Sequence, residues 1–117
     1  MDKNNLGLYY LESDKKKGIK LLKESKTAES YFNLALAQPE KEVKYYTKAA
    51  ALGNMDAIYN LGLIHLDNKK YKLAFKHFQK VAKTGHLDAI HNLGLMYYKG
   101  LGIDKNENIG ESLLRIK

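Results

Sequence analysis

The chain contains no cysteine and no tryptophan, and proline occurs once in 117 residues. Without cysteine, neither a disulfide framework nor a thiolate metal site can form. No run of 18 apolar residues occurs, and the first ten residues, MDKNNLGLYY, lack a basic segment followed by an apolar one. We therefore expect no membrane span and no signal peptide, and the sequence predicts a soluble cytoplasmic protein.

Arginine is also nearly absent. Arg115 is the single arginine among 20 basic residues, and with 13 acidic residues the formal net charge is +7. Arginine makes the bidentate contacts that suit phosphate groups and base edges, whereas lysine offers a flexible point charge. The lysine excess therefore does not by itself indicate a nucleic-acid partner, and we expect protein to be the favoured partner.

The residue patterns that chemistry requires are missing as well. The four histidines show no HExxH-like spacing. Gly100 and Gly102 form a Gly-x-Gly pair, but no strand pattern precedes them as it would in a nucleotide-binding loop. No nucleophile can be matched with a base. The sequence thus predicts a protein that is not an enzyme and that uses neither a cofactor nor a metal.

What the sequence does contain is a repeat. The segment DAIYNLGL at 56–63 returns as DAIHNLGL at 88–95, 32 residues later. Asn-Leu followed by a small residue occurs four times, beginning at Asn5, Asn33, Asn60 and Asn92. Repeats of this length are typical of helical solenoids. We interpret residues 1–117 as one domain of four units, at 2–25, 28–51, 55–84 and 87–116.

Each unit has the apolar spacing of two helices. In the third unit, Ala57, Ile58 and Leu61 follow the helical period, DNKK at 67–70 interrupts it, and the period resumes at Tyr71. No strand pattern occurs, so the predicted fold class is all-α. The eight predicted helices span 2–12, 15–25, 28–37, 39–51, 55–66, 70–84, 87–98 and 106–116.

Three glycines, Gly7, Gly62 and Gly94, lie in the middle of predicted helices. Each costs about 0.5–1 kcal/mol relative to alanine, which suggests that another backbone approaches there. Ala74 and Gly110 lie at matching points of the helices that follow. We predict that small residues on both helices let the two members of a pair cross at a short distance.

The third and fourth units resemble Sel1 repeats. The resemblance rests on an Ala-x-x-Gly helix end, then Ala with Asn-Leu-Gly, then Tyr and a Gly-x-Gly loop with Asp. These features are Ala82, Gly85, Ala89, Leu93, Gly94, Tyr97, Gly100, Gly102 and Asp104. Residues 57–82 are also similar to the tetratricopeptide pattern, through Tyr59, Asn60, Leu61, Gly62, Tyr71, Ala74 and Phe78.

Both families imply a right-handed superhelical solenoid of about four helical hairpins, in which the first helices line a concave face. Both also imply an adaptor or scaffold that binds other proteins, without catalytic residues. The fourth unit departs from the pattern in its last helix, which keeps only Ile109, Gly110 and Leu114 of the expected residues.

We predict that the repeated asparagines and their neighbours form a peptide-binding surface on this concave face. An asparagine amide donates and accepts hydrogen bonds at once, which suits the backbone of a bound peptide. The alternative is that these asparagines bridge adjacent helices and that the nearby leucines pack between units. The predicted contact residues are Phe32, Asn33, Leu36, Tyr59, Asn60, Leu63, Leu66, His91, Asn92, Leu95 and Tyr98.

A second hypothesis concerns five lysines with no acidic residue between them. Helical spacing places most of them on one outer, convex face, where they would contact nucleic acid or an acidic protein; the alternative is a solvated face. These lysines are Lys69, Lys72, Lys76, Lys80 and Lys83. The first and last helices carry apolar side chains, so dimerisation through the terminal helices is a further expectation.

Overall fold

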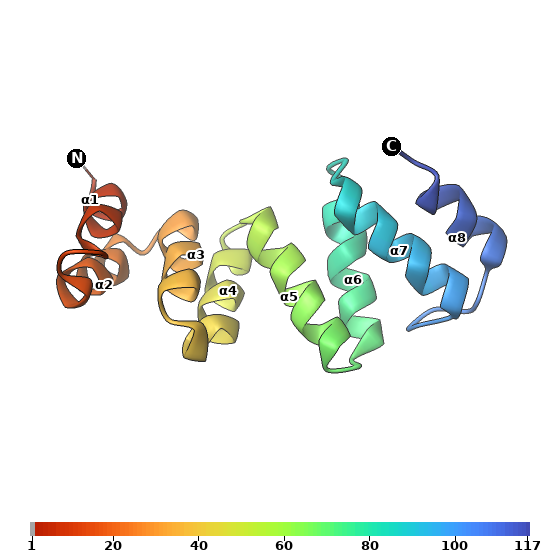
Figure 1. Cartoon of the computed structure of the whole chain (residues 1–117), viewed down its shortest axis with the longest axis horizontal. Coiled ribbons are helices and arrows are strands. Elements are labelled where there is room, and N and C mark those ends of the chain that lie inside the picture. Colours follow the sequence, from red (N-terminus) through yellow and green to blue (C-terminus); the bar gives the residue numbers. More distant parts are fainter. Residues whose placement is uncertain (1) are drawn as a thin grey trace. The chain divides into compact units, whose positions relative to one another are not determined.

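The computed structural model describes residues 2–117, which form eight α-helices and one short 3-10 helix and contain no β-strand (Figure 1). In chain order these are α1 (Lys3–Tyr10), α2 (Lys15–Ser25), α3 (Ala28–Ala37), η1 (Pro39–Lys41), α4 (Glu42–Ala51), α5 (Met55–Asp67), α6 (Tyr71–Ala82), α7 (Leu87–Lys99) and α8 (Glu107–Leu114). The predicted all-α class is confirmed, and every predicted helix has a counterpart.

The chain divides into two compact units, which are larger than the four repeats described above. From here on, the first unit is the one that ends at Ala57, and the second unit is Ile58–Lys117. Helix α5 begins just before this boundary, so most of it belongs to the second unit. Each unit has its own buried side chains, and we describe each by itself.

The first unit consists of the hairpins α1/α2 and α3/α4, drawn from red to yellow in Figure 1. Leu22 and Leu34 are fully buried in it, and Tyr45 is nearly so. Helices α1 and α2 cross at two glycines, because a Cβ built on Gly18 would lie 2.7 Å from the carbonyl oxygen of Gly7. The close approach predicted at Gly7 is therefore confirmed, and Gly18 is the partner that sequence reasoning missed.

The second unit holds most of α5 and all of α6, α7 and α8. Phe78 and Val81 of α6 are fully buried, and Met96 of α7 is nearly so. Helices α7 and α8 cross as predicted, since a Cβ on Gly110 would lie 2.8 Å from the carbonyl oxygen of Gly94. This contact joins two backbones and leaves no room for a side chain on either helix.

The α5/α6 crossing differs from the prediction. The three atoms nearest to a Cβ built on Gly62 all belong to the ring of Phe78, at 2.8 to 3.1 Å. Ala74, the expected neighbour, is fully buried on α6, but the glycine makes room for an aromatic ring one turn later. The small residue therefore serves packing, as predicted, with a large partner in place of a small one.

Side chains at the helix starts explain several boundaries. Asp2, Asp14 and Asn106 each accept a hydrogen bond from a backbone N–H in the first turn of the helix that follows. Thr27 and Ser30 form a reciprocal capping box at 3.0 and 2.8 Å. Such a cap stabilises a helix by about 1 kcal/mol, so these short polar residues fix where α1, α2, α3 and α8 begin.

Several helix ends differ from the predicted ones by one to three residues, within the margin expected of such boundaries. Pro39 starts the 3-10 helix η1, and α4 begins at Glu42. Proline suits a first helical turn, and Gln38 before it is non-helical, with φ of −128° and ψ of 76°. The last helix ends at Leu114 and not at residue 116. Among residues 2–117, no helix has the length and apolar character that crossing a bilayer requires.

Candidate peptide-binding surface

Helices α5 and α7 of the second unit are joined by a hydrogen bond between two predicted site residues. The Nδ2 of Asn92 donates to the hydroxyl of Tyr59 at 3.1 Å. The Tyr59 ring lies between Phe78 and His86, with centroid distances of 5.6 and 4.5 Å. The bond therefore rests on a ring held by packing, and it links α5 to α7.

The first unit contains an equivalent bond. The Nδ2 of Asn33 on α3 donates to Oδ1 of Asn4 on α1 at 3.0 Å, and Asn4 is only 5% exposed. Asn5, the residue at the repeated position itself, is exposed and hydrogen-bonds to Asp2. In both units the acceptor is thus the residue just before the repeated asparagine of the preceding first helix.

These bonds match the alternative that the sequence left open, in which the asparagines bridge adjacent helices. Each bond uses only one N–H of the repeated asparagine, whose amide has two N–H donors and one carbonyl acceptor. Within the second unit, no hydrogen bond uses Oδ1 of Asn92. The residue is half-buried, so its remaining polar groups lie near the surface.

The environment of Tyr59 keeps its hydroxyl protonated. Burial raises the pKa of the phenol, the nearby Asp88 carboxylate raises it further, and the hydrogen bond from Asn92 opposes both. A protonated phenol that already accepts one hydrogen bond can still donate its own proton. Tyr59 therefore retains one donor at neutral pH.

Three predicted residues on α7 share one face, because His91, Leu95 and Tyr98 are spaced by four and three residues. Leu95 is 43% exposed and Tyr98 is 38% exposed. His91 is half-buried, and its Nε2 donates to the carbonyl oxygen of Ile116 at 2.7 Å. The segment after α8 is thus tied to α7 beside the two exposed anchors.

The remaining predicted residues lie on α5 and α3. Asn60, Leu63 and Leu66 of α5 are half-buried. In the first unit, the ring of Phe32 packs 5.7 Å from Tyr46, and Leu36 is 57% exposed. Of the eleven predicted residues, the pair brought into direct contact by a hydrogen bond is Tyr59 and Asn92.

The five lysines of the second hypothesis are all exposed. Lys69 precedes α6 in a left-handed conformation, with φ of 59°. The ion pairs within residues 58–117 join Lys105 to Glu107 and Arg115 to Glu111, so they include none of the five. The stripe therefore presents its charges to solvent within its own unit.

No group of three or more potential metal ligands forms among residues 2–117. His65 and His77 come together on α5 and α6 with ring centroids 5.1 Å apart. Burial lowers the pKa of His65, and the nearby His77 and Lys70 lower it further. This pair has the character of a half-buried packing contact.

Sequence reasoning missed two features. Asn4 was overlooked because the repeat placed the important asparagine at position 5. The hollowed, lysine-rich surface of the first unit, on α2 and α4, was also missed. The spacing of Lys16, Lys20 and Lys23, at four and three residues, is the same signal that was recognised on α6.

Comparison with known proteins identifies the repeat. The Sel1 repeat family model matches residues 4–38, 43–54, 56–86 and 87–115. A protective antigen of uropathogenic Escherichia coli strains, described as displaying an SLR fold, is 26% identical with a TM-score of 0.79 over 97% of this chain and 29% of its own. A Sel1 repeat protein from Oxalobacter formigenes is 25% identical with a TM-score of 0.78 over 95% of this chain and 54% of its own.

The chain thus spans less than two thirds of either solved relative. No curated protein matches it. The family matches extend over all four hairpins, with the second hairpin divided between two matches. They include the glycine crossings and the bridging asparagines described above. The chain therefore belongs to the Sel1 repeat family.

Proposed function

We propose that this protein binds an extended peptide or a helix of a partner protein along α5 and α7 of its second unit. Sel1 repeats generally act as scaffolds for protein–protein interactions. The proposal adds a surface and a mode of binding to that general role. It does not include catalysis, a cofactor or a metal.

The observation that carries the proposal is the Tyr59–Asn92 bridge beside exposed apolar anchors. The bridge leaves a phenol donor and an amide acceptor near the surface, and a peptide backbone offers both complementary groups. Leu95 and Tyr98 lie on the adjacent face of α7. Anchors of this type, next to fixed polar groups, are typical of peptide-recognition surfaces.

The remaining predicted residues belong to the proposal as two separate sets, one in each unit. Asn60, Leu63, Leu66 and His91 line the same two helices. In the first unit, Phe32, Asn33 and Leu36 occupy equivalent places on α3, and we propose that they make equivalent contacts.

Peptides selected from a random library against the full chain test the proposal. We expect Leu95→Ser to lower the affinity for a selected peptide by at least about tenfold, which is the loss typical of an interface anchor. Leu73→Ser is the matched control, because Leu73 on α6 is 45% exposed and is not part of the proposed surface. Fluorescence anisotropy gives both affinities, and equal losses would contradict the proposal.

A triple variant tests the polar part of the surface. Tyr59→Ala, Asn60→Ala and Asn92→Ala together remove the bridge and the neighbouring amide. We expect binding to be lost while circular dichroism still reports a helical chain. Full binding by the folded triple variant would exclude these side chains from the interface.

The α6 lysine stripe supports a second candidate function, the electrostatic binding of nucleic acid or of an acidic protein. Residues 58–117 contain ten basic and five acidic residues, a net charge of +5. Such binding weakens steeply as salt rises. Gel-shift measurements at two salt concentrations test it, and a shift that salt does not change would disfavour the stripe.

Dimerisation through the terminal helices and a cytoplasmic location stay predictions. For dimerisation, the supporting observation is that Ile109, Leu114 and Ile116 near the end of the chain are 36 to 42% exposed. Light scattering at high concentration tests it, and a monomer mass would remove it.

A further inference from the structure

Three junctions connect a second helix to the next first helix, and all three contain a left-handed residue. Each of these residues comes seven positions before a repeated asparagine and immediately before the residue that caps the next helix. They are Lys26, Gly53 and Gly85, with φ of 53°, 92° and 86°. The capping residues are Thr27, Asn54 and His86. The repeat therefore calls for glycine here, and the first junction has lysine.

This lysine is conformationally unfavourable. A left-handed backbone brings Cβ close to the following carbonyl in any residue other than glycine. Nothing lies within 4 Å of a Cβ built on Gly53 or Gly85, so the two equivalent glycine junctions offer a side chain no packing that would offset such strain. A strained residue of this kind is a reason to ask what its side chain contacts.

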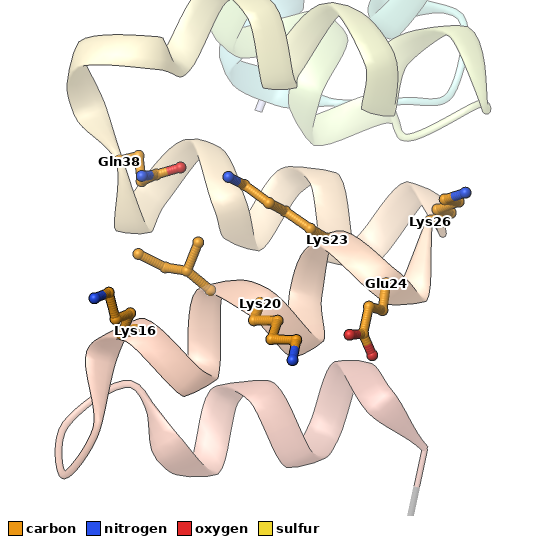
Figure 2. A pocket seen from close by; sticks show the side chains of 7 residues that line it. Lys16, Lys20, Lys23, Glu24, Lys26 and Gln38 are labelled. Carbon is orange, nitrogen blue, oxygen red and sulfur yellow. The ribbon is translucent and has the colours of Figure 1, made fainter.

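The side chain of Lys26 lines two neighbouring depressions of the first unit. One is an open groove of about 490 Å³ on α2, the α2 groove, where Ile19 lies among Lys16, Lys20 and Lys23. Figure 2 shows these lysines along α2, with Gln38 at the end of α3 facing them across the groove. The other, of about 270 Å³, lies between α2, α3 and α4, and we call it the α4 hollow. Lys23 and Lys26 line both.

The two depressions are strongly basic. Six lysines line them, namely Lys16, Lys20, Lys23, Lys26, Lys44 and Lys48, against one acid, Glu24. Glu24 is itself paired with Lys3 at 3.2 Å, and this is the ion pair formed within residues 2–57. Each of the six lysines is exposed, so within this unit their charges are not neutralised.

Aromatic rings hold part of the α4 hollow in place. The rings of Tyr31 and Tyr45 stack with centroids 6.4 Å apart. The Nζ of Lys48 lies 5.4 Å from the Tyr31 ring, and that of Lys44 lies 5.5 Å from the Tyr45 ring. Cation–π contacts of this kind restrict where the ammonium groups sit, so the hollow presents its charges at defined places.

We propose that the α2 groove and the α4 hollow together bind an acidic segment of a partner protein. Carboxylates would pair with the lysines, and an apolar side chain would contact Ile19 and the lysine stems, which are themselves apolar. A short acidic segment is favoured over nucleic acid because the positive charge of this unit is local: residues 1–57 contain ten lysines and eight acidic residues, a net charge of only +2. A short acidic segment lies within screening distance of the lysine cluster alone, whereas a long polyanion also comes close to the surrounding acidic residues, which repel it.

A short fluorescein-labelled peptide rich in glutamate and containing leucine is the probe. Two further probes are the same peptide with glutamine in place of glutamate, and a single-stranded DNA of equal charge. We expect Lys20→Glu/Lys23→Glu to weaken the acidic peptide at least about tenfold, since like charges then face it. The matched control is Lys99→Glu/Lys117→Glu, the same charge change on exposed lysines that belong neither to the two depressions nor to the five-lysine stripe, and it should change the affinity less than about twofold.

Lys26→Gly separates function from fold. Glycine relieves the left-handed strain, so the thermal midpoint should rise while binding of the acidic peptide falls severalfold. An unchanged affinity would overturn the proposal, as would equal losses from the two lysine pairs, equal binding of the glutamine peptide, or tighter binding of the DNA. If the Lys20→Glu/Lys23→Glu variant fails to fold, Lys20→Gln/Lys23→Gln provides the same test. Leu95→Ser should leave acidic-peptide binding intact, which keeps this result distinct from that of the α5/α7 surface.

Discussion

In the first unit the repeated asparagine bonds to another asparagine, and in the second unit it bonds to a tyrosine. Both units also contain a hairpin in which two glycines meet, Gly7 with Gly18 and Gly94 with Gly110. The side-chain contact has changed its chemistry between the units, whereas the backbone contact has not. A contact between two backbones accepts only glycine, and a contact between side chains can be remade in several ways.

The largest effect is expected where backbone meets backbone. Gly110→Ala places a methyl group 2.8 Å from the carbonyl oxygen of Gly94, and neither helix can yield without separating. We expect a loss of about 2–3 kcal/mol, typical of overpacking, measured by urea unfolding. Ser112→Ala on the same helix is the control and should stay within about 0.5 kcal/mol. A Gly110→Ala variant as stable as the control would show that the crossing is loose.

The α5/α6 crossing should respond differently because its obstacle is a side chain. Gly62→Ala brings a methyl group 2.8 Å from the Phe78 ring, at a cost of about 1–2 kcal/mol. Adding Phe78→Leu should restore part of this loss, so the double variant should be more stable than the two single effects predict. Additive effects in urea unfolding would mean that Phe78 is not the obstacle. No such rescue is expected for Gly110→Ala.

The junction residues offer an exchange between the units. Lys26→Gly should stabilise the chain by up to about 1 kcal/mol, because relief of left-handed strain exceeds the added freedom of the unfolded chain. Gly85→Lys should destabilise it by a similar amount, since φ there is 86°. Thermal unfolding measures both. Effects of the same sign in the two variants would contradict the assignment of strain.

The smallest expected effect is pH dependence, and it distinguishes the units because all four histidines lie in residues 58–117. Burial lowers the pKa of His65 below its usual 6.5, with His77 and Lys70 adding to the shift. The folded state then binds fewer protons than the unfolded state, so stability is present above pH 6.5 and is lost as the pH falls below it. Urea midpoints at pH 7.5 and 5 should show a smaller drop for His65→Tyr than for the unchanged chain.

The helices could be predicted because each has a repeating apolar face and, in most cases, a recognisable start. Glycines such as Gly94 could be predicted as crossing points because their cost within a helix requires an explanation. Their partners were harder to predict. Gly18 lies among lysines, whose pattern predicts a solvent-exposed helix face. The position of Phe78 opposite Gly62 depends on the offset between two helices, which the local sequence does not determine.

The bridging partners could not be predicted for a related reason. The repeat identifies Asn33 and Asn92, but their acceptors, Asn4 and Tyr59, share no residue type. The strain at Lys26 was equally hidden, since a lysine at the end of a helix looks like a favourable last-turn cation. It stands out only when the structure aligns it with Gly53 and Gly85.

The bridge has a consequence for exchanging hairpins among proteins of this family. The residue before the repeated asparagine has to match the hairpin that follows, because Tyr59 accepts a hydrogen bond from Asn92, 33 positions later. A transplanted hairpin would therefore bring a donor without its matching acceptor. A graft that begins after the acceptor residue would therefore lose this hydrogen bond. A graft that contains both the acceptor and the next repeated asparagine would keep it.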